Sequence, residues 1–213
     1  MTTISEHESK RLLAEYGVPL ASERVAHTTD EAVVAARELG YPVVAKLAGD
    51  GIAHKTERGL VRLGLSSDDD VAAACDELLA ASTPDDGDVV VLVAPMLAGA
   101  RELIAGVHDD PQFGRCVMIG IGGVLTEALS DVAFRLVPID EIDAGEMLDD
   151  LAAQPLLGPV RGEPALDRAA TVSVLLALSR LAEEHPEVVA VDVNPLIVVD
   201  GRPIAVDALV EVR

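Results

Sequence analysis

The sequence predicts an α+β protein with two lobes. Segments with strand-like alternation and segments with helical periodicity follow one another without the regular strand–helix rhythm of a parallel α/β sheet. Proline and glycine interrupt an apolar strand at 95–99, so we expect the junction of the lobes there. Near the C-terminus a turn at Asp200–Pro203 separates two apolar strands, which predicts antiparallel pairing.

The first half of the chain is expected to begin with two helices. Ser5–Glu8 and Thr28–Glu31 have the spacing of capping boxes, and Gly17 and Gly40 are placed to end the helices that follow. Further along we expect strands at 23–26, 42–48, 59–65 and 88–96, and a helix at 68–81 that begins with three aspartates.

The second half is expected to contain more strands and two longer helices. Leu175, Leu178 and Leu181 form an apolar stripe that predicts an amphipathic helix at 166–184, and a shorter helix is expected at 142–151. The expected strands are 101–107, 115–120, 132–137, 188–193, 196–199 and 204–210.

The composition narrows the classes of function and environment. The 213 residues, half of them apolar, suffice for one domain or two small lobes, and the net charge of −21 argues against nucleic acid or an anionic membrane as partner. Thirteen arginines against three lysines predict a halophilic cytoplasm, although a merely acidic cytosolic protein is the alternative. Cys75 and Cys116 lack zinc or C-x-x-C spacing, and no signal-peptide or membrane-spanning run is found, so a reduced, cytoplasmic location is expected.

The most informative stretch is the hairpin expected at 42–65. Lys46 lies within its apolar first strand, where an ammonium group needs a counter-charge. The loop at 49–56 matches the P-loop pattern except that His54 replaces the second glycine, and a strand-like rather than helical segment follows. The sequence therefore excludes a P-loop and leaves a loop that carries His54 and Lys55.

His54 itself has two interpretations. A loop histidine is usually only solvated, and the alternative is a carrier of phosphoryl groups. The other histidines do not have the spacing of zinc ligands, which argues against a zinc site.

A second group of polar residues predicts a metal site near the C-terminus. Asp192 and Asn194 are two residues apart in a strand, so their side chains share a face, and the following hairpin returns Asp207 towards them. Three oxygen-bearing side chains at one strand end suit Mg²⁺. Turn-capping residues are the alternative interpretation.

Other candidate residues are weaker individually. Gly120–Gly123 could let backbone N–H groups approach a phosphate, but it is not a dinucleotide fingerprint. Glu102, Glu127 and Arg135 are charges beside or within apolar segments, and Arg135 is expected to pair with one of these acids or with phosphate.

Taken together, the motifs resemble the ATP-grasp subunit of ADP-forming acetyl-CoA synthetases, in the order of that family and over nearly the whole chain. The stretches that carry the resemblance are Leu12-Leu13-x-x-Tyr16-Gly-Val-Pro after Glu8, Gly40-Tyr-Pro-Val-Val-x-Lys46, His54-Lys55-Thr56, Val93-Ala94-Pro95-Met96, Arg101-Glu102-Leu-Ile-x-Gly106, Asp110-Pro-Gln-Phe-Gly114, Gly122-Gly123, Phe134-Arg135-Leu-Val-Pro138 and Asp192-Val-Asn194-Pro195.

The resemblance implies an ATP-grasp fold, two α+β lobes with mostly antiparallel sheets, divided as residues 1–96 (N-terminal helix and first lobe) and 97–213 (second lobe with the metal site). It implies that ATP or ADP binds with Mg²⁺. The implied nucleotide contacts are Lys46 at the phosphates, Val93, Ala94 and Met96 at the adenine, Glu102 near the ribose or phosphates, and Lys55, Gly122, Gly123 and Arg135.

The resemblance further implies that His54 receives a phosphoryl group from a phosphohistidine on a CoA-binding alpha subunit and passes it to ADP, and that Asn194 and Asp207, with Asp192, hold Mg²⁺. The chain lacks the CoA-binding half, so a hetero-oligomer of the α2β2 kind is expected. Two other functions stay open: an ATP-grasp carboxylate–amine ligase, which would not need His54, and a non-catalytic module that senses nucleotide or acyl-CoA.

Overall fold

The computed structural model describes residues 2–49, 51–52, 55, 58–123 and 130–213. The chain divides into two compact units. We call Ser5–His7 with Ala21–Leu97 the N-terminal unit, and Met1–Ile4 with Glu8–Leu20 and Ala98–Arg213 the C-terminal unit. The junction falls within the predicted stretch 95–99. The expected division into residues 1–96 and 97–213 differs from these units, because Met1–Ile4 and Glu8–Leu20 belong to the C-terminal unit and Leu97 belongs to the N-terminal unit.

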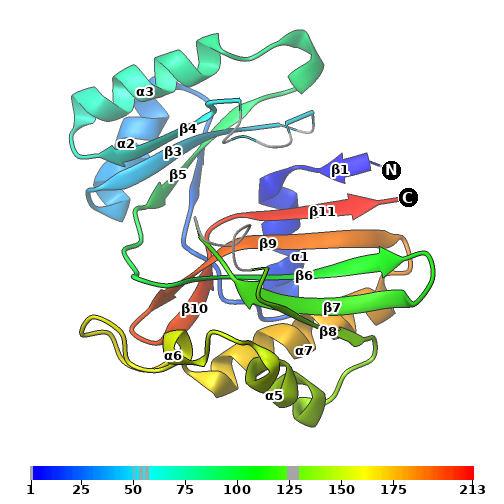
Figure 1. Cartoon of the computed structure of the whole chain (residues 1–213). Helices are drawn as coiled ribbons and strands as arrows, with labels where there is room; N and C mark the ends of the chain where they lie inside the picture. Colours follow the sequence, from blue (N-terminus) through cyan, green and yellow to red (C-terminus); the bar gives the residue numbers. More distant parts are fainter. Residues whose placement is uncertain (1, 50, 53–54, 56–57, 124–129) are drawn as a thin grey trace. The chain divides into compact units, whose positions relative to one another are not determined.

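The N-terminal unit is a four-stranded antiparallel sheet with two helices on one face (Figure 1). The strand order is β2-β5-β3-β4. The strands are β2 (Arg24–Ala26), β3 (Val43–Ala48), β4 (Val61–Leu65) and β5 (Val90–Pro95); the helices are α2 (Thr29–Leu39) and α3 (Asp68–Ala80), followed by the 3₁₀ turn η1 (Pro84–Asp86). Thr28 caps α2 as predicted, since its side chain accepts a hydrogen bond from the N–H of Glu31 at 3.2 Å.

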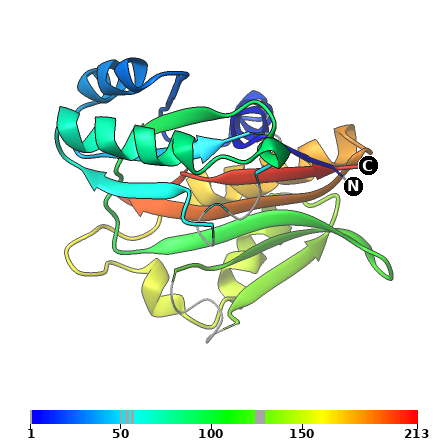
Figure 2. The ribbon, with the colours of Figure 1, turned by 90° about the horizontal axis from the view of Figure 1, so that it is seen from above.

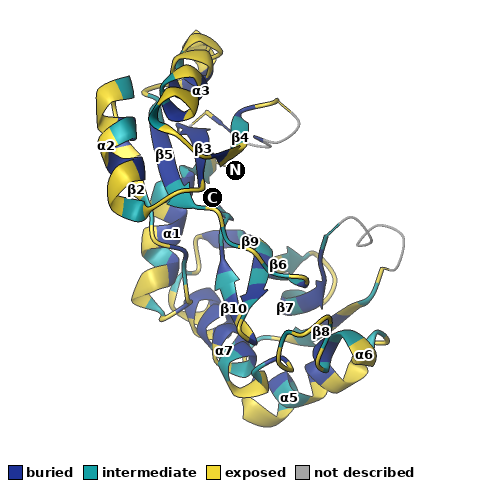
Figure 3. Ribbon diagram, turned by 90° about the vertical axis from the view of Figure 1, so that its left-hand side faces the viewer, coloured by how far each residue is buried: buried dark blue, intermediate teal, exposed yellow. Residues whose placement is uncertain are grey.

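Alternation along β3 assigns its side chains to two faces of this sheet. Val43, Ala45 and Leu47 belong to the core formed with α2 and α3, whereas Lys46 and its neighbours two residues away do not. Figure 3 shows β3 buried in the sheet and the outer faces of α2 and α3 exposed. Lys46 therefore occupies the sheet face that α2 and α3 do not cover.

The C-terminal unit is built on a seven-stranded antiparallel sheet in the order β1-β11-β9-β6-β7-β8, with β10 paired to β9. Figures 1 and 2 show β11, β9, β6 and β7 running side by side. The strands are β1 (Thr2–Ile4), β6 (Glu102–Asp110), β7 (Gly114–Ile121), β8 (Val132–Leu136), β9 (Val188–Val199), β10 (Arg202–Ala205) and β11 (Ala208–Val212). The helices are α1 (Glu6–Glu15, whose first two residues belong to the N-terminal unit), α5 (Glu141–Asp150), α6 (Gln154–Leu157) and α7 (Arg168–Glu184).

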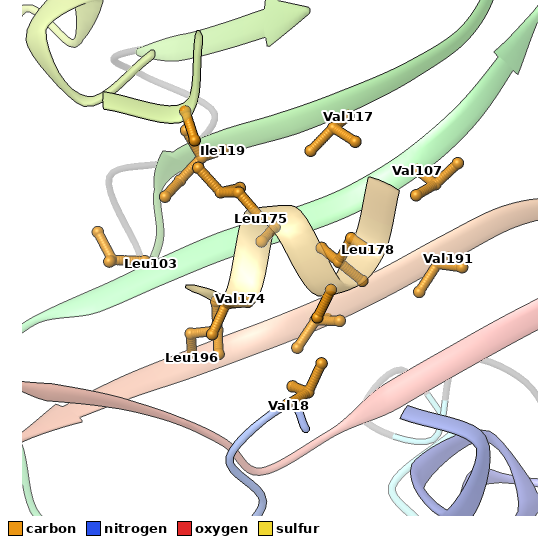
Figure 4. Close-up of a cluster of buried hydrophobic side chains, with 14 of the residues drawn as sticks. Val18, Leu103, Val107, Val117, Ile119, Val174, Leu175, Leu178, Val191 and Leu196 are labelled. Carbon is orange, nitrogen blue, oxygen red and sulfur yellow. The ribbon is translucent and has the colours of Figure 1, made fainter. Parts of the chain in front are cut away.

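Helix α7 forms the core of this unit against the sheet. Leu175, Leu178 and Leu181 are fully buried, as the apolar stripe predicted. Figure 4 shows Leu175 and Leu178 among side chains of β6, β7 and β9. Helix α5 packs against α7 and β8 on the same side of the sheet. The strand residues that alternate with these core residues have their side chains on the opposite face of the sheet.

Two strand boundaries near the C-terminus differ from expectation. The segment at 188–199 is one strand, β9, because Asn194 and Pro195 together face a single residue, Ile104, in a bulge between the pairs Leu103–Leu196 and Ala105–Val193. Proline lacks the N–H of a regular strand and is tolerated at such a bulge. The strand expected at 204–210 is divided into β10 and β11, which pair with different halves of β9.

Candidate functional site

Lys46 is almost fully buried and paired with an acid. Its residue is 8% exposed, and its Nζ donates a hydrogen bond to Oε1 of Glu6 at 3.0 Å. The Glu6 side chain has no exposed surface. The counter-charge that the sequence required for Lys46 is therefore supplied by the first residue of α1.

Lys55 is paired with the same carboxylate. Its Nζ donates to Oε2 of Glu6, and the residue is 7% exposed. One carboxylate thus bridges two ammonium groups. Sequence reasoning missed Glu6, because it used residues 5–8 only as a helix cap. Lys46 in an apolar strand indicated that an acidic partner must exist, but nothing in the sequence distinguished Glu6 from the other acids among the 37.

The glycines of the loop after β3 allow close backbone packing. Side chains at Gly49 or Gly51 would collide with backbone oxygens of Asp86 and Asp85, and the N–H of Gly51 donates to the carbonyl of Asp86 at 3.2 Å. These glycines therefore fit against η1. The predicted phosphoryl carrier His54 lies outside the described residues.

The predicted adenine contacts on β5 and just after it face different directions. Val93 is fully buried in the core with α2 and α3, so its side chain does not face the surface that carries Lys46. Ala94 is half-buried and lies on the opposite face by alternation. Met96 is 43% exposed, and its N–H donates to the carbonyl of Pro42 at 3.0 Å. Of the three, Ala94 and Met96 present side chains for a ligand.

In the C-terminal unit the structure brings Glu102, Gly122 and Gly123 together. The N–H of Gly122 donates to the carbonyl of Glu102 at 2.7 Å, and a side chain at Gly123 would lie 3.4 Å from Oε2 of Glu102. Gly123 has a positive φ of 80°, which favours glycine. A cavity of about 220 Å³ opens beside them, lined mainly by leucine, isoleucine and valine side chains.

Arg101 shapes the wall of this cavity, a role that the sequence did not reveal. Its guanidinium donates to the carbonyl oxygens of Leu156, Gly158 and Pro164, and its Nε lies 3.5 Å from Oε2 of Glu163. The side chain is 4% exposed. It therefore holds the segment around α6 against the start of β6.

The three predicted metal ligands lie at one place in the sheet. Asp192 and Asn194 are both exposed, between the buried Val191, Val193 and Leu196 of β9. The N–H of Asn194 donates to the carbonyl of Asp207 at 3.3 Å, so the turn between β10 and β11 returns Asp207 beside them. The backbone therefore brings Asp192, Asn194 and Asp207 close together, as the sequence predicted.

The donor set fits Mg²⁺ in its chemistry. Carboxylate and amide oxygens are the hard ligands that Mg²⁺ prefers, and one or two carboxylates suffice when phosphate oxygens complete its shell. No group of three or more His, Cys, Asp and Glu side chains suited to a metal occurs in the described part of the chain. A metal at this trio would therefore depend on the amide oxygen and on oxygens of a ligand.

Arg135 does not join these residues. On β8 it lies opposite Val117, which is in the core under the helices, and its guanidinium donates to Asp150 at 2.8 Å and lies 3.6 Å from Glu146, both on α5. These carboxylates raise its pKa above the usual value, chiefly through the hydrogen bond with Asp150. In the described residues Arg135 is therefore paired with α5 and not with Glu102, whereas Glu127 lies outside the described residues.

Comparison with known proteins identifies the family. Residues 1–212 match the family model of the ATP-grasp domain. The chain is 40% identical to the beta subunit of acetate–CoA ligase (ADP-forming) II from Pyrococcus furiosus, over 92% of this chain and 85% of that protein. The chain belongs to the ATP-grasp family of ADP-forming acetate–CoA ligase beta subunits.

Solved structures agree with this membership in the ATP-grasp family. An acetyl-coenzyme A synthetase 1 from Ca. Korarchaeum cryptofilum, in complex with coenzyme A and Ca-AMPCP, is 34% identical with a TM-score of 0.91 and covers 100% of this chain and 94% of that chain. A second structure of that enzyme contains coenzyme A and Mg-AMPPCP, with a phosphohistidine segment pointing towards the nucleotide site; it is 36% identical, has a TM-score of 0.82, and covers 98% and 92% of the two chains.

These findings confirm the ATP-grasp fold and the family predicted from the sequence. They do not concern the individual site residues, whose roles remain predictions. Within the part of the chain that the structure describes, the helices lack the length and apolar character needed to span a lipid bilayer.

Proposed function

We propose that this chain is the nucleotide-binding subunit of an ADP-forming acyl-CoA synthetase, in which it transfers a phosphoryl group between a phosphohistidine and ADP. The observation that carries the proposal is the similarity to a beta subunit of such a ligase, which extends over 92% of this chain and 85% of the relative. The residues present support it, because the chain has buried lysines suited to phosphate and exposed oxygen-bearing side chains on β9 suited to a metal.

Lys46 and Lys55 are the groups proposed for the nucleotide phosphates. Phosphoryl transfer requires mainly positioning and neutralisation of charge on the phosphate oxygens. Lys46 is held on the sheet face that α2 and α3 leave uncovered. Of the candidates for adenine contact, Ala94 lies on the neighbouring strand β5 and Met96 directly follows that strand. This arrangement suits a nucleotide that lies along one face of the sheet.

In the C-terminal unit, Asp192, Asn194 and Asp207 are the proposed ligands of Mg²⁺. When bound there, the metal would neutralise charge on the nucleotide phosphates. Glu102, with Gly122 and Gly123 packed against it, is proposed to contact the ribose or the phosphates. The Mg-nucleotide analogue in a related acetyl-coenzyme A synthetase supports ATP or ADP with Mg²⁺ as the ligand.

His54 is the proposed acceptor of the phosphoryl group. In the forward direction a P–N bond on an alpha-subunit histidine breaks as a P–N bond on His54 forms; the second bond then breaks as an oxygen of ADP takes the phosphoryl group. The alpha subunit is the proposed partner in a cytoplasmic hetero-oligomer of the α2β2 kind. The name "subunit beta" of the relative supports a partner subunit.

The test is a labelling experiment with the chain and its co-expressed alpha subunit. With γ-labelled ATP and Mg²⁺, we expect an acid-labile, base-stable phosphoryl group on His54. The variant His54→Gln should abolish this label on the chain, whereas His27→Gln, at an exposed position, should retain it. Lys46→Met should lower the labelling rate at least about tenfold, because the phosphates lose a fixed positive charge.

Two outcomes would contradict the proposal. An active complex with no label on this chain would favour direct chemistry on the bound nucleotide, as in a carboxylate–amine ligase, and His54→Gln would then be harmless. Nucleotide binding that needs no Mg²⁺, without any phosphoenzyme, would instead indicate a sensing module.

A further inference from the structure

The loop between β3 and β4 is fastened at two points to a single residue. Residues 49–60 form this β3–β4 loop, and Asp86 belongs to the turn η1. On the first side of the loop, the N–H of Gly51 donates to the carbonyl of Asp86 at 3.2 Å. On the second side, Arg58 donates to both carboxylate oxygens of Asp86, at 2.7 and 3.0 Å. Asp86 therefore joins the two sides of the loop, one through its backbone and the other through its side chain.

Asp86 is itself a buried and well-bonded anchor. Its side chain is 2% exposed, and the N–H and hydroxyl of Thr83 donate to its carboxylate at 2.8 and 3.0 Å. A two-pronged bond between a guanidinium and a carboxylate fixes the relative orientation of the two groups as well as their distance. A side chain at Gly51 would collide with the carbonyl of Asp85, so glycine at this position permits the close approach of the loop to η1.

The two fastened positions enclose the part of the loop that carries the candidate phosphoryl acceptor. Residues 52–57 lie between Gly51 and Arg58 in the sequence and include His54. Fixing both ends of a short segment limits the conformations open to the residues between them. Phosphoryl transfer depends mainly on positioning, and a misplacement of about 1 Å lowers such a rate by about a hundredfold. The two anchors therefore bear directly on the rate of transfer.

We propose that Asp86 and Arg58 form a positioning pair that fixes the β3–β4 loop for phosphoryl transfer through His54. This inference rests on the proposed function, because His54 is the phosphoryl acceptor there. In this role neither member of the pair contacts the transferred group, and both act through the loop.

The pair is distinct from the lysines proposed for the phosphates. Lys46 and Lys55 donate to the carboxylate of Glu6, which is neither Asp86 nor part of η1. These bonds remain when the bond between Arg58 and Asp86 is removed. Loss of the pair is therefore expected to slow phosphoryl transfer more than it weakens nucleotide binding.

The rate of labelling at saturating Mg-ATP tests this role. The complex of the chain with its alpha subunit is mixed with γ-labelled ATP and Mg²⁺, and label on this chain is followed over time. Affinity is measured separately by calorimetry with the analogue Mg-AMPPCP, which does not transfer its terminal phosphoryl group. Arg58→Gln removes the two-pronged bond, and we expect the saturated rate to fall at least about tenfold, with affinity within about threefold of wild type.

Arg37→Gln is the matched control. The Nε of Arg37 donates to the two carboxylate oxygens of Asp68 at 3.1 and 3.0 Å, so this pair resembles that of Arg58 but joins α2 to α3. Its removal leaves the bonds between the loop and η1 in place, and we expect a saturated rate within about twofold of wild type. Equal losses in the Arg37 and Arg58 variants would refute a specific effect through the loop.

A double variant tests whether the two residues act together. Arg58→Gln and Asp86→Asn break the same connection, so the double variant should be labelled no more slowly than Asp86→Asn alone. Independent contributions would multiply, and a multiplied loss of rate would refute the shared role. Circular dichroism checks the fold of each variant. Should Asp86→Asn not fold, the comparison of Arg58→Gln with Arg37→Gln decides.

The outcomes separate this inference from the proposed function. If the wild-type complex acquires no label on this chain, the proposed function is wrong. If it is labelled and Arg58→Gln keeps the wild-type saturated rate, only the positioning role is refuted. A lower thermal midpoint with an unchanged saturated rate would mean that the pair merely stabilises the fold. A loss of labelling that disappears at saturating Mg-ATP would assign the effect to nucleotide binding and refute positioning as well.

Discussion

Asp86 is a buried acid whose charge is stabilised by several donors. Arg58 donates to its two oxygens at 2.7 and 3.0 Å, and the N–H and hydroxyl of Thr83 donate at 2.8 and 3.0 Å. These hydrogen bonds, chiefly those from Arg58, hold the pKa of Asp86 far below its usual value. The carboxylate therefore stabilises the fold only while it is ionised.

This lowered pKa predicts a specific loss of stability in acid. A carboxylate with a depressed folded-state pKa contributes stability that is present above its unfolded pKa of about 4 and is lost as the pH falls towards the folded-state pKa. Asp86→Asn should lower the free energy of unfolding at pH 7 and flatten its decline below about pH 4. Urea unfolding from pH 7 to pH 2 measures this. Asp69→Asn, at an exposed position on α3, serves as control, and an unchanged acid slope in Asp86→Asn would contradict the assignment.

Single residues differ in how far the sequence could predict them. Lys46 was predictable because a charge in an apolar strand is conspicuous. Glu6 was not, since its partners are 40 and 49 residues away and only the fold brings them together. Arg135 shows the converse difficulty: its need for an acid was predicted, but the acid is on α5 and not at the candidate site.

At the level of elements, helix α7 makes the largest single contribution of apolar side chains to the C-terminal core. Leu178 is fully buried against the sheet (Figure 4). Leu176, on the same helix, is only partly buried. Truncating a fully buried leucine removes apolar contacts and leaves a cavity. The two leucines therefore form a matched pair for testing the packing of α7.

We expect Leu178→Ala to lower the free energy of unfolding by about 2–5 kcal/mol, and Leu176→Ala to lower it by less than half as much. Denaturant unfolding of both variants with their alpha subunit absent measures the difference, and circular dichroism checks that each variant is folded. Equal losses at the two positions would mean that α7 packs with a different face.

The elements themselves were largely predictable, and their ends and partners were less so. Apolar runs identified β3, β5 and most of β9, and capping residues located the start of α2. The bulge at Asn194 and Pro195 was not foreseen, because the sequence shows that proline disrupts a ladder but not that a partner strand can accommodate the extra residue. The division of 204–210 depended likewise on pairing with two halves of β9.

At the scale of the whole chain, the packing of α1 was beyond sequence reasoning. The capping box at Ser5–Glu8 and the glycine at position 17 predicted this helix but not which lobe it packs with. Leu13 and Val18 belong to the core of the C-terminal unit, and the hydroxyl of Ser9 accepts a hydrogen bond from the N–H of Val210 at 3.1 Å. Chain order alone would assign α1 to the N-terminal unit, which is nearer to it in the sequence. The pairing of β1 with β11 instead places the start of the chain in the C-terminal unit.

Net charge is the second property of the whole chain, and it predicts a dependence on salt. A charge of −21 on 213 residues repels itself in the folded state, and salt screens this repulsion over about 10 Å at 0.1 M and about 3 Å at 1 M. We therefore expect the thermal midpoint at pH 7.5 to rise by several degrees between 0.1 and 2 M KCl, which supports the halophilic origin proposed from composition.

The control is the same salt series near the isoelectric point of about 4.4, where the net charge is small. Screening of self-repulsion predicts that the rise in thermal midpoint largely disappears there. General exclusion of salt from the protein surface, which strengthens apolar burial at any net charge, predicts an equal rise at both pH values. An equal rise would therefore assign the salt effect to exclusion and remove this support for a halophilic origin.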